Sequence, residues 1–202
     1  NKDMDKKGQL ADLPIKKKPY IMTRWSIPFA GFLLTLMGGA SYAWSVFVDP
    51  MAEEFGWTKT EAFLPFTVYL VIFALGMVPA GKLQDKIGPR KISFVGAILF
   101  LIAYGLSALV EQFPYPWWLV LTYGIIGGTA CSLAYACAVP PARKWFPDKP
   151  GLAISVSLTG FGLSALFFAP LKAGYLIPTY GIIKTFLTLG ITASAVCLFA
   201  AW

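Results

Sequence analysis

The sequence has 202 residues, of which 57 % are hydrophobic and 13 % charged, about half the charged share of a soluble domain. Its 17 Lys and Arg against 10 Asp and Glu give a net charge of +7, and the charges stand in short clusters between long uncharged runs. A basic face for nucleic-acid phosphates is therefore disfavoured, and a lipid bilayer is the expected surrounding.

The sequence offers no set of metal ligands and no nucleophile beside a base. Histidine is absent, and Cys131, Cys137 and Cys197 all lie in apolar runs, where a small buried thiol is the simplest interpretation. The glycines between 124 and 128 lack the strand, lysine and serine of a phosphate-binding loop. We therefore expect no enzymatic activity, no metal and no cofactor.

Six uncharged runs are long enough to cross a membrane as helices. The first, from Trp25 to Val48, would make about 36 Å of helix, against a hydrocarbon core of roughly 30 Å. No small-residue cleavage site follows it, so we expect no cleaved signal peptide. After a basic tail at 1–24, the expected spans are 25–48, 62–80, 92–110, 116–139, 151–171 and 185–202.

The distribution of Lys and Arg predicts the orientation. Fourteen of the 17 lie in the tail, in residues 81–91 and in residues 143–150. Because cytoplasmic loops carry the excess of Lys and Arg, we expect a multi-pass protein of the cell (inner) membrane with its N-terminus in the cytoplasm. The tail is expected to lie against anionic lipid. Lys172 and Lys184 would then stand in the outer loop between spans five and six, against the rule.

Two similar segments indicate an internal repeat. GGASYAW at 38–44 in the first span corresponds to GGTACSLAY at 127–135 in the fourth, with paired glycines, further small residues and a tyrosine. Equivalent first and fourth spans would make two inverted three-helix units, as in one half of a major facilitator transporter. Paired glycines also allow close helix packing without any repeat, and both interpretations remain open at this point.

Residues 81–91 read GKLQDKIGPRK, with an acid placed between two glycines. This pattern resembles the signature loop between the second and third helices of the major facilitator superfamily. Gly81 is expected to let the second helix approach a neighbour, Gly88 with Pro89 to make the turn, and Asp85 to lie beside the amino end of the third helix. The resemblance implies a conformational latch between the aspartate and basic residues. Its residues here are Gly81, Asp85, Gly88, Arg90, Lys91 and, by position, Arg143.

A second motif narrows the family. KWFPDKPGLA at 144–153 and SLTGFGLSAL at 157–166 resemble the junction of helices four and five in the oxalate/formate antiporter family, relatives of the monocarboxylate transporters. We expect Asp148 to cap the fifth helix and Pro150 to stand in its first turn. Three glycines are expected to give that helix a smooth packing face: Gly151, Gly160 and Gly162. The implied fold is an all-α membrane protein, the six-helix N-terminal bundle of a major facilitator fold, built as a 3+3 inverted repeat.

The resemblance implies secondary active transport of small carboxylate anions by alternating access, as proton symport or anion exchange. Lactate, formate and oxalate are the candidate substrates. No Lys, Arg, Asp or Glu stands inside the first five spans, so an anion would find no counter-charge here, and the family supplies one from a second set of six helices. We therefore expect a C-terminal six-helix half as partner, beside lipid and substrate. The alternative is a six-helix sensor or assembly protein that moves no solute.

The candidate substrate-binding residues lie on the first, fourth and fifth spans. Tyr42 and Tyr135 offer phenol donors to a carboxylate and aromatic faces to a carbon chain. Ser41 and Trp44 are expected as wall residues. Phe161 stands where some relatives have a tyrosine, which would favour a short aliphatic monocarboxylate over a dicarboxylate. Taken singly, each tyrosine is equally consistent with packing or with an interfacial aromatic belt.

Overall fold

The computed structural model describes the backbone of residues 21–201 and the side chains of residues 25–200, so residues 1–20 of the expected basic tail at 1–24 lie outside this range. Within the described residues every regular element is a helix. Five helical segments are long and apolar enough to cross a membrane: Trp25–Phe55, Lys59–Ile87, Pro89–Glu111, Pro116–Trp145 and Pro150–Ala200. The last of these is interrupted at Gly181, whose φ of 75° and ψ of 177° are not helical. The described chain therefore forms six rods.

The rods combine α-helices with short 3₁₀ or π-helical turns. The first three consist of α2 (Ile21–Gly39), η1 (Ala40–Trp44) and α3 (Ser45–Phe55), then α4 (Lys59–Ile87), then α5 (Pro89–Ser107) with η2 (Ala108–Glu111). The last three consist of α6 (Pro116–Leu119), η3 (Val120–Gly127) and α7 (Gly128–Trp145), then α8 (Pro150–Leu171) with η4 (Lys172–Leu176) and the start of α9 (Ile177–Ala201) as far as Gly181, then the rest of α9. The all-α fold expected from the sequence is thus confirmed.

The second rod is longer than its uncharged run. A capping box starts α4: the Thr58 hydroxyl accepts from the Glu61 amide, and the Glu61 carboxylate accepts from the Thr58 amide at 2.9 Å. At the other end α4 runs past residue 80 to Ile87, and Gly88, at a φ of +94°, makes the turn before Pro89 opens α5. Most of the expected loop at 81–91 is therefore helical. A search for uncharged runs misses such ends, because charged side chains are tolerated where a helix leaves the hydrocarbon.

The start of α8 also differs from the expectation. The cap position belongs to Lys149 and carries no side-chain cap hydrogen bond, whereas Asp148 was expected there. Pro150 opens the helix as expected, since its missing amide hydrogen has no partner to lose at that position. Of the three glycines, only Gly160 lies in tight contact, and a Cβ at Gly151 or Gly162 would meet no described atom within 4 Å.

Helix pairing follows an inverted repeat. The first rod packs mainly on the fifth, through α2 and α8, and the fourth packs mainly on the second, through α7, η3 and α4. The third and sixth rods, α5 and α9, pair with each other. If rods one and four, two and five, and three and six are exchanged, the pair of rods one and five becomes the pair of rods four and two. The pair of rods three and six is unchanged. The described helices therefore have the 3+3 organisation that the two similar segments predicted.

The paired glycines mark equivalent contacts in this arrangement. A Cβ at Gly39 in α2 would lie 2.8 Å from Ser164 Cβ in α8, and a Cβ at Gly128 in α7 would lie 2.8 Å from the Tyr69 carbonyl oxygen in α4. Each glycine pair thus lets its helix approach the partner that the repeat assigns to it. The paired glycines therefore allow close helix packing and also occupy equivalent positions of the repeat, so both interpretations of them hold.

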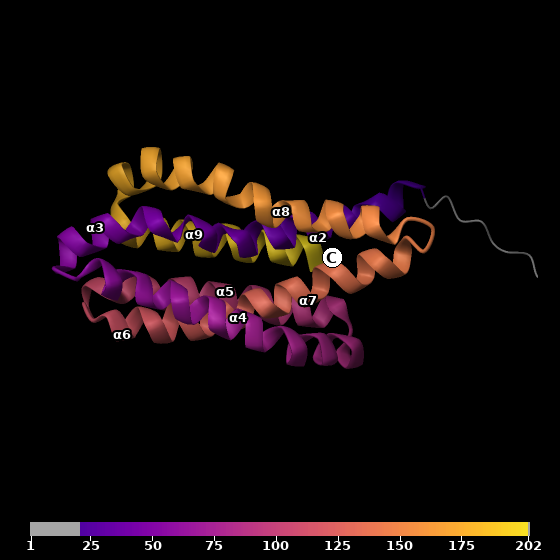
Figure 1. The fold of residues 1–202 in the computed structure, drawn as a ribbon, viewed down its shortest axis with the longest axis horizontal. Helices are drawn as coiled ribbons and strands as arrows, with labels where there is room; N and C mark the ends of the chain where they lie inside the picture. The colour runs from indigo at the N-terminus through magenta and orange to yellow at the C-terminus, as the bar shows by residue number, and fades with distance from the viewer. Residues whose placement is uncertain (1–20, 202) are drawn as a thin grey trace, which may run out of the picture.

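Both ends of the described chain lie at one end of the bundle. Figure 1 shows the start of α2 and the end of α9 at the end that also holds the α4–α5 and α7–α8 connections. These connections carry seven Lys and Arg, between Lys82 and Lys149. The outward faces are apolar, as in Leu75, Leu166 and Phe199, whose side chains are 69 %, 68 % and 73 % exposed. Such faces are expected of a bundle in contact with lipid.

An aromatic cluster fills the centre of the bundle. Trp44 lies 4.3 Å from Tyr123 between ring centroids, and Phe47 stacks on Phe186 at 5.0 Å. The Trp44 indole Nε1 donates to the Ala62 carbonyl oxygen at 2.9 Å, which links the first rod to the second. The cluster therefore holds the rods together from within.

Candidate functional site

A cavity of about 650 Å³ lies on the face where the first, second, fourth and fifth rods meet. Its lining is aromatic and aliphatic, with two phenol groups: Tyr42, Phe73, Met77, Tyr135, Leu158, Phe161, Gly162 and Ala165. A mostly apolar pocket with a few polar groups is the usual form of a small-molecule site. Three of the five expected substrate-binding residues meet in it.

Phe161 stands between the two tyrosines. Its ring centroid lies 5.7 Å from that of Tyr42 and 5.7 Å from that of Tyr135, edge to face in both cases. Within the described residues neither phenol hydroxyl has a hydrogen-bond partner, and the Tyr42 side chain is 46 % exposed. Each hydroxyl can therefore donate to a ligand in the cavity without giving up an existing bond.

The η1 turn decides which side chains reach the cavity. The backbone of Ala43 leaves helical geometry there, at a φ of −85° and a ψ of 29°. Ser41 and Trp44 are buried on the inner side of the turn, where the Ser41 hydroxyl donates to the Gly38 carbonyl oxygen at 2.8 Å. Neither residue lines the cavity, although the sequence placed both among its walls.

Contacts between α2 and α8 hold the wall that carries Phe161. The Ser164 hydroxyl donates to the Leu36 carbonyl oxygen at 2.8 Å, and the Thr35 hydroxyl donates to the Ser157 carbonyl oxygen. A Cβ at Gly160, next to Phe161, would collide with the Phe32 carbonyl oxygen and the Thr35 hydroxyl. The two helices are therefore in backbone contact, and Phe161 has little freedom to shift along α2.

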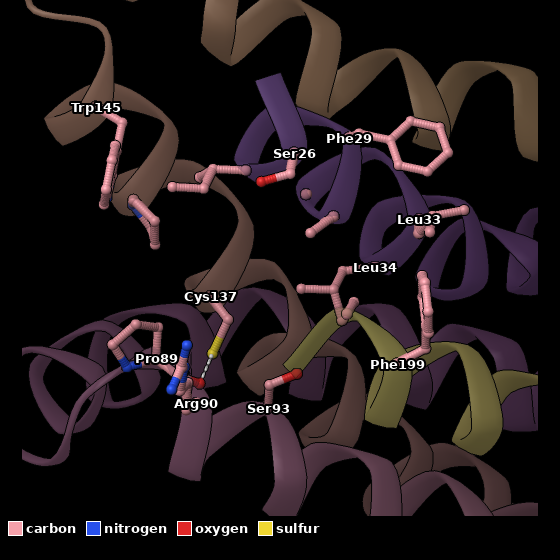
Figure 2. Close-up of a pocket in the computed structure, with 15 residues that line it drawn as sticks. Ser26, Phe29, Leu33, Leu34, Pro89, Arg90, Ser93, Cys137, Trp145 and Phe199 are labelled. Atoms are coloured by element: carbon pink, nitrogen blue, oxygen red, sulfur yellow. Dashed lines mark hydrogen bonds between the residues drawn. The ribbon is translucent and has the colours of Figure 1, made fainter. Parts of the chain in front are cut away.

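A second cavity, of about 630 Å³, lies between rods at the basic end of the bundle and is open to the surface (Figure 2). Figure 2 shows Phe29, Leu34 and Phe199 on one side and Arg90 beside Pro89 on the other, with the Cys137 thiol donating to the Pro89 carbonyl oxygen at 3.3 Å. Its lining residues come from α2, α5, α7 and α9. The first cavity is the better candidate site, because three of the residues expected from the sequence line it.

The motif residues of the α4–α5 turn do not form the expected pairs. Asp85 lies in the last turn of α4, and its carboxylate Oδ1 is 3.9 Å from the Lys144 ammonium, with both side chains mostly exposed. Within the described residues no ion pair joins Asp85 to Arg90 or to Arg143. The partner, Lys144, directly follows Arg143 in the sequence. Because both lie at the same basic helix end, the sequence could have suggested Lys144 as well.

The other motif glycines and basic residues have separate surroundings. Gly88 makes the turn as expected, but a Cβ at Gly81 would meet no described atom within 4 Å, so the close approach expected there is absent from the described residues. Arg90 borders the second cavity, and Lys91 and Arg143 are exposed at the same end of the bundle. The motif thus gathers charge at one end without a tight network.

Lys172 is the residue that sequence reasoning misplaced most. Its side chain is 1 % exposed, at the point where α8 passes into η4, and is not part of an outer loop. The ammonium Nζ donates to the Ala40 carbonyl oxygen at 2.7 Å and lies 5.1 Å from the centroid of the Phe47 ring. The uncharged run ends at this lysine, but the helix does not, so the charge was assigned to a loop.

Comparison with known proteins adds a family and several relatives. Residues 28–202 match the family described as Major Facilitator Superfamily. The chain is 29 % identical over 154 residues to the oxalate:formate antiporter of Oxalobacter formigenes, covering 76 % of this chain and 36 % of that protein.

Two further relatives extend the comparison. Identity is 27 % over 183 residues to the uncharacterized MFS-type transporter YhjX of Escherichia coli (strain K12), covering 90 % of this chain and 44 % of that protein. It is 23 % over 148 residues to monocarboxylate transporter 13 of Rattus norvegicus, covering 73 % and 34 %. The chain thus spans less than half the length of each of these three relatives.

Proposed function

Because the chain belongs to the major facilitator superfamily, we propose that it takes part in secondary active transport of small carboxylate anions across the cell (inner) membrane. The observation that carries the proposal is the pair of unpartnered phenols, Tyr42 and Tyr135, on one cavity shared by the first and fourth rods. The names of two relatives, an oxalate:formate antiporter and a monocarboxylate transporter, point to the same class of solute.

The cavity suits a carboxylate with a short apolar chain. Tyr42 and Tyr135 donate to the carboxylate oxygens, and a hydrogen bond to a charged group contributes about 1.5–3 kcal/mol. Phe161 between them, with Phe73 beyond, offers only aromatic carbon to the rest of the solute. A monocarboxylate such as lactate or formate is therefore favoured over oxalate, whose second charge would face these rings without a partner.

Transport proceeds by alternating access, in which a second six-helix half covers the cavity and rocks against this one. Asp85 and Lys144, with the neighbouring cations Arg90, Lys91 and Arg143, form a latch at the cytoplasmic end of the bundle. An exposed ion pair contributes only about 0–1 kcal/mol, which suits a contact that must open in every cycle. The solute is carried either by symport with protons or by exchange for another anion.

The proposal is tested by counterflow of labelled lactate, formate and oxalate in proteoliposomes that contain the chain with its second half. Tyr135→Phe removes one donor and leaves the ring, so we expect the apparent KM for the transported anion to rise roughly tenfold, with membrane insertion unchanged. Tyr180→Phe is the matched control, because Tyr180 is exposed and lies outside the cavity.

Two results would contradict the proposal. Absence of counterflow for all three anions would remove the carboxylate assignment and favour a six-helix sensor or assembly protein. A Tyr135→Phe protein that matched the parent in both KM and rate would remove Tyr135 from the site.

A further inference from the structure

Lys172 is a cation buried inside a membrane bundle with few partners of its own. Of its three N–H donors, one is used, at the Ala40 carbonyl oxygen, and the remaining stabilisation comes from the Phe47 ring. In the described part of the chain no carboxylate oxygen lies within 4 Å of its Nζ. A buried charge without a counter-ion opposes folding, so its presence in a span calls for a function.

The position of Lys172 relates it to the cavity. Lys172 follows Phe161 by eleven residues and Ala165 by seven, which at 3.6 residues per turn places all three on one face of the α8 rod. Phe161 and Ala165 line the cavity. The rise of 1.5 Å per residue puts Lys172 about 10 Å beyond Ala165 along the helix axis.

A second connection runs through the first rod. The ammonium is held at Ala40, where α2 passes into η1, and Tyr42 of the cavity stands two residues further along that turn. Both anchors of the ammonium, the Ala40 carbonyl and the Phe47 ring, belong to this rod. The ammonium is therefore fixed in the interior beside the turn that carries Tyr42 and is shielded from water.

We propose that Lys172 supplies the positive charge of this half, and that its field makes the cavity prefer anions to uncharged solutes of the same shape. This inference rests on the proposed function and deepens it. Lys172 acts at a distance and does not touch the solute. In a surrounding with an effective dielectric constant of about 20, two unit charges roughly 10 Å apart interact strongly enough to change an affinity about tenfold.

The test separates charge from hydrogen bonding at residue 172. Lys172→Gln keeps a donor for the Ala40 carbonyl but removes the charge, whereas Lys172→Arg keeps the charge. The control is Lys184→Gln, because Lys184 is an exposed cation of α9. The measurement is the concentration of unlabelled lactate, or of its uncharged analogue lactamide, that halves counterflow of labelled lactate in the protein with both halves.

The expected pattern concerns the ratio of the two inhibitors. Lys172→Gln raises the half-inhibiting concentration of lactate about tenfold and leaves that of lactamide within about twofold. Lys172→Arg and Lys184→Gln stay within about threefold of the parent for both. A merely structural role of Lys172 would shift both inhibitors together, so the ratio reports the charge alone.

Specific outcomes would overturn the inference. If Lys172→Gln left the ratio unchanged in a protein that still transports, the charge would play no part. If Lys172→Gln and Lys172→Arg raised the half-inhibiting concentration of lactate equally, the role of Lys172 would be packing. Should Lys172→Gln not fold, Lys172→Met gives the same readout, because an apolar chain of similar length avoids the buried charge. Absence of counterflow in the parent would instead contradict the proposed function.

Discussion

Adjacent residues of the η1 turn point to opposite sides of one wall. Tyr42 is 46 % exposed and faces the cavity, whereas Ser41 and Trp44 are each 1 % exposed and face the core. A 3₁₀ turn has three residues per turn, so Ser41 and Trp44 share one side and Tyr42 is rotated away from it. Trp44 therefore supports the site through its packing on Tyr123 and its hydrogen bond to the Ala62 carbonyl.

Trp44→Phe should consequently affect stability and leave the apparent affinity for lactate unchanged. Loss of the indole hydrogen bond and of part of the ring contact is expected to lower the free energy of unfolding by about 1–3 kcal/mol. Unfolding in detergent micelles and lactate counterflow measure the two effects. Trp117→Phe, at a tryptophan that is 67 % exposed, is the control. A weaker affinity with unchanged stability would instead place Trp44 in contact with the solute.

At the scale of the elements, α8 is the helix that joins the site to the first rod. It approaches α2 through Gly160, where an added Cβ would meet the Leu36 amide nitrogen at 2.8 Å as well as the Phe32 carbonyl oxygen. Gly162, two residues further along, has open space around it. The two glycines look alike in sequence, but only one of them is required by the helix pair.

The pair Gly160→Ala and Gly162→Ala tests this difference within one helix. Gly160→Ala forces the backbones of α2 and α8 apart and is expected to lower the free energy of unfolding by about 1–3 kcal/mol. Gly162→Ala is expected to be neutral or stabilising by up to about 1 kcal/mol, because alanine favours the helix. Thermal unfolding of the purified protein in micelles distinguishes them. Equal effects of the two substitutions would contradict the close contact at Gly160.

At the scale of the whole molecule, the first and fourth rods of the inverted repeat pack on each other through α2 and α7. Gly38 of α2 faces Cys131 of α7, and a Cβ at Gly38 would lie 3.0 Å from the Cys131 Sγ. That separation is the one a disulfide requires between a Cβ and the opposite sulfur. None of the native cysteines Cys131, Cys137 and Cys197 forms a disulfide.

Gly38→Cys should therefore form a disulfide with Cys131 under mild oxidation by a membrane-permeant reagent. The link joins residues 93 positions apart, and mass spectrometry of the oxidised, digested protein detects the joined peptides. The same substitution with Cys131→Ser is the control and should give no such peptide. If the linked peptide did not form in folded protein, the contact between the first and fourth rods would be wrong.

The sequence by itself determined that lipid is the solvent of this protein, that it is all helical, and that Tyr42, Tyr135 and Phe161 are candidate site residues. Long uncharged runs and motifs such as GKLQDKIGPRK are properties of short stretches, so they can be recognised without contacts. The helix ends were less accessible, because residues 81–87 are charged and still helical.

The tertiary structure alone decided which side chains of the η1 turn face the cavity, that Asp85 pairs with Lys144, and that Lys172 is buried. These features depend on the rotation of each helix about its axis and on contacts between distant segments. The bond from Lys172 to the Ala40 carbonyl spans 132 positions. A pattern in one stretch of sequence carries no information about a partner so far away, because only the packing of the rods brings the two together.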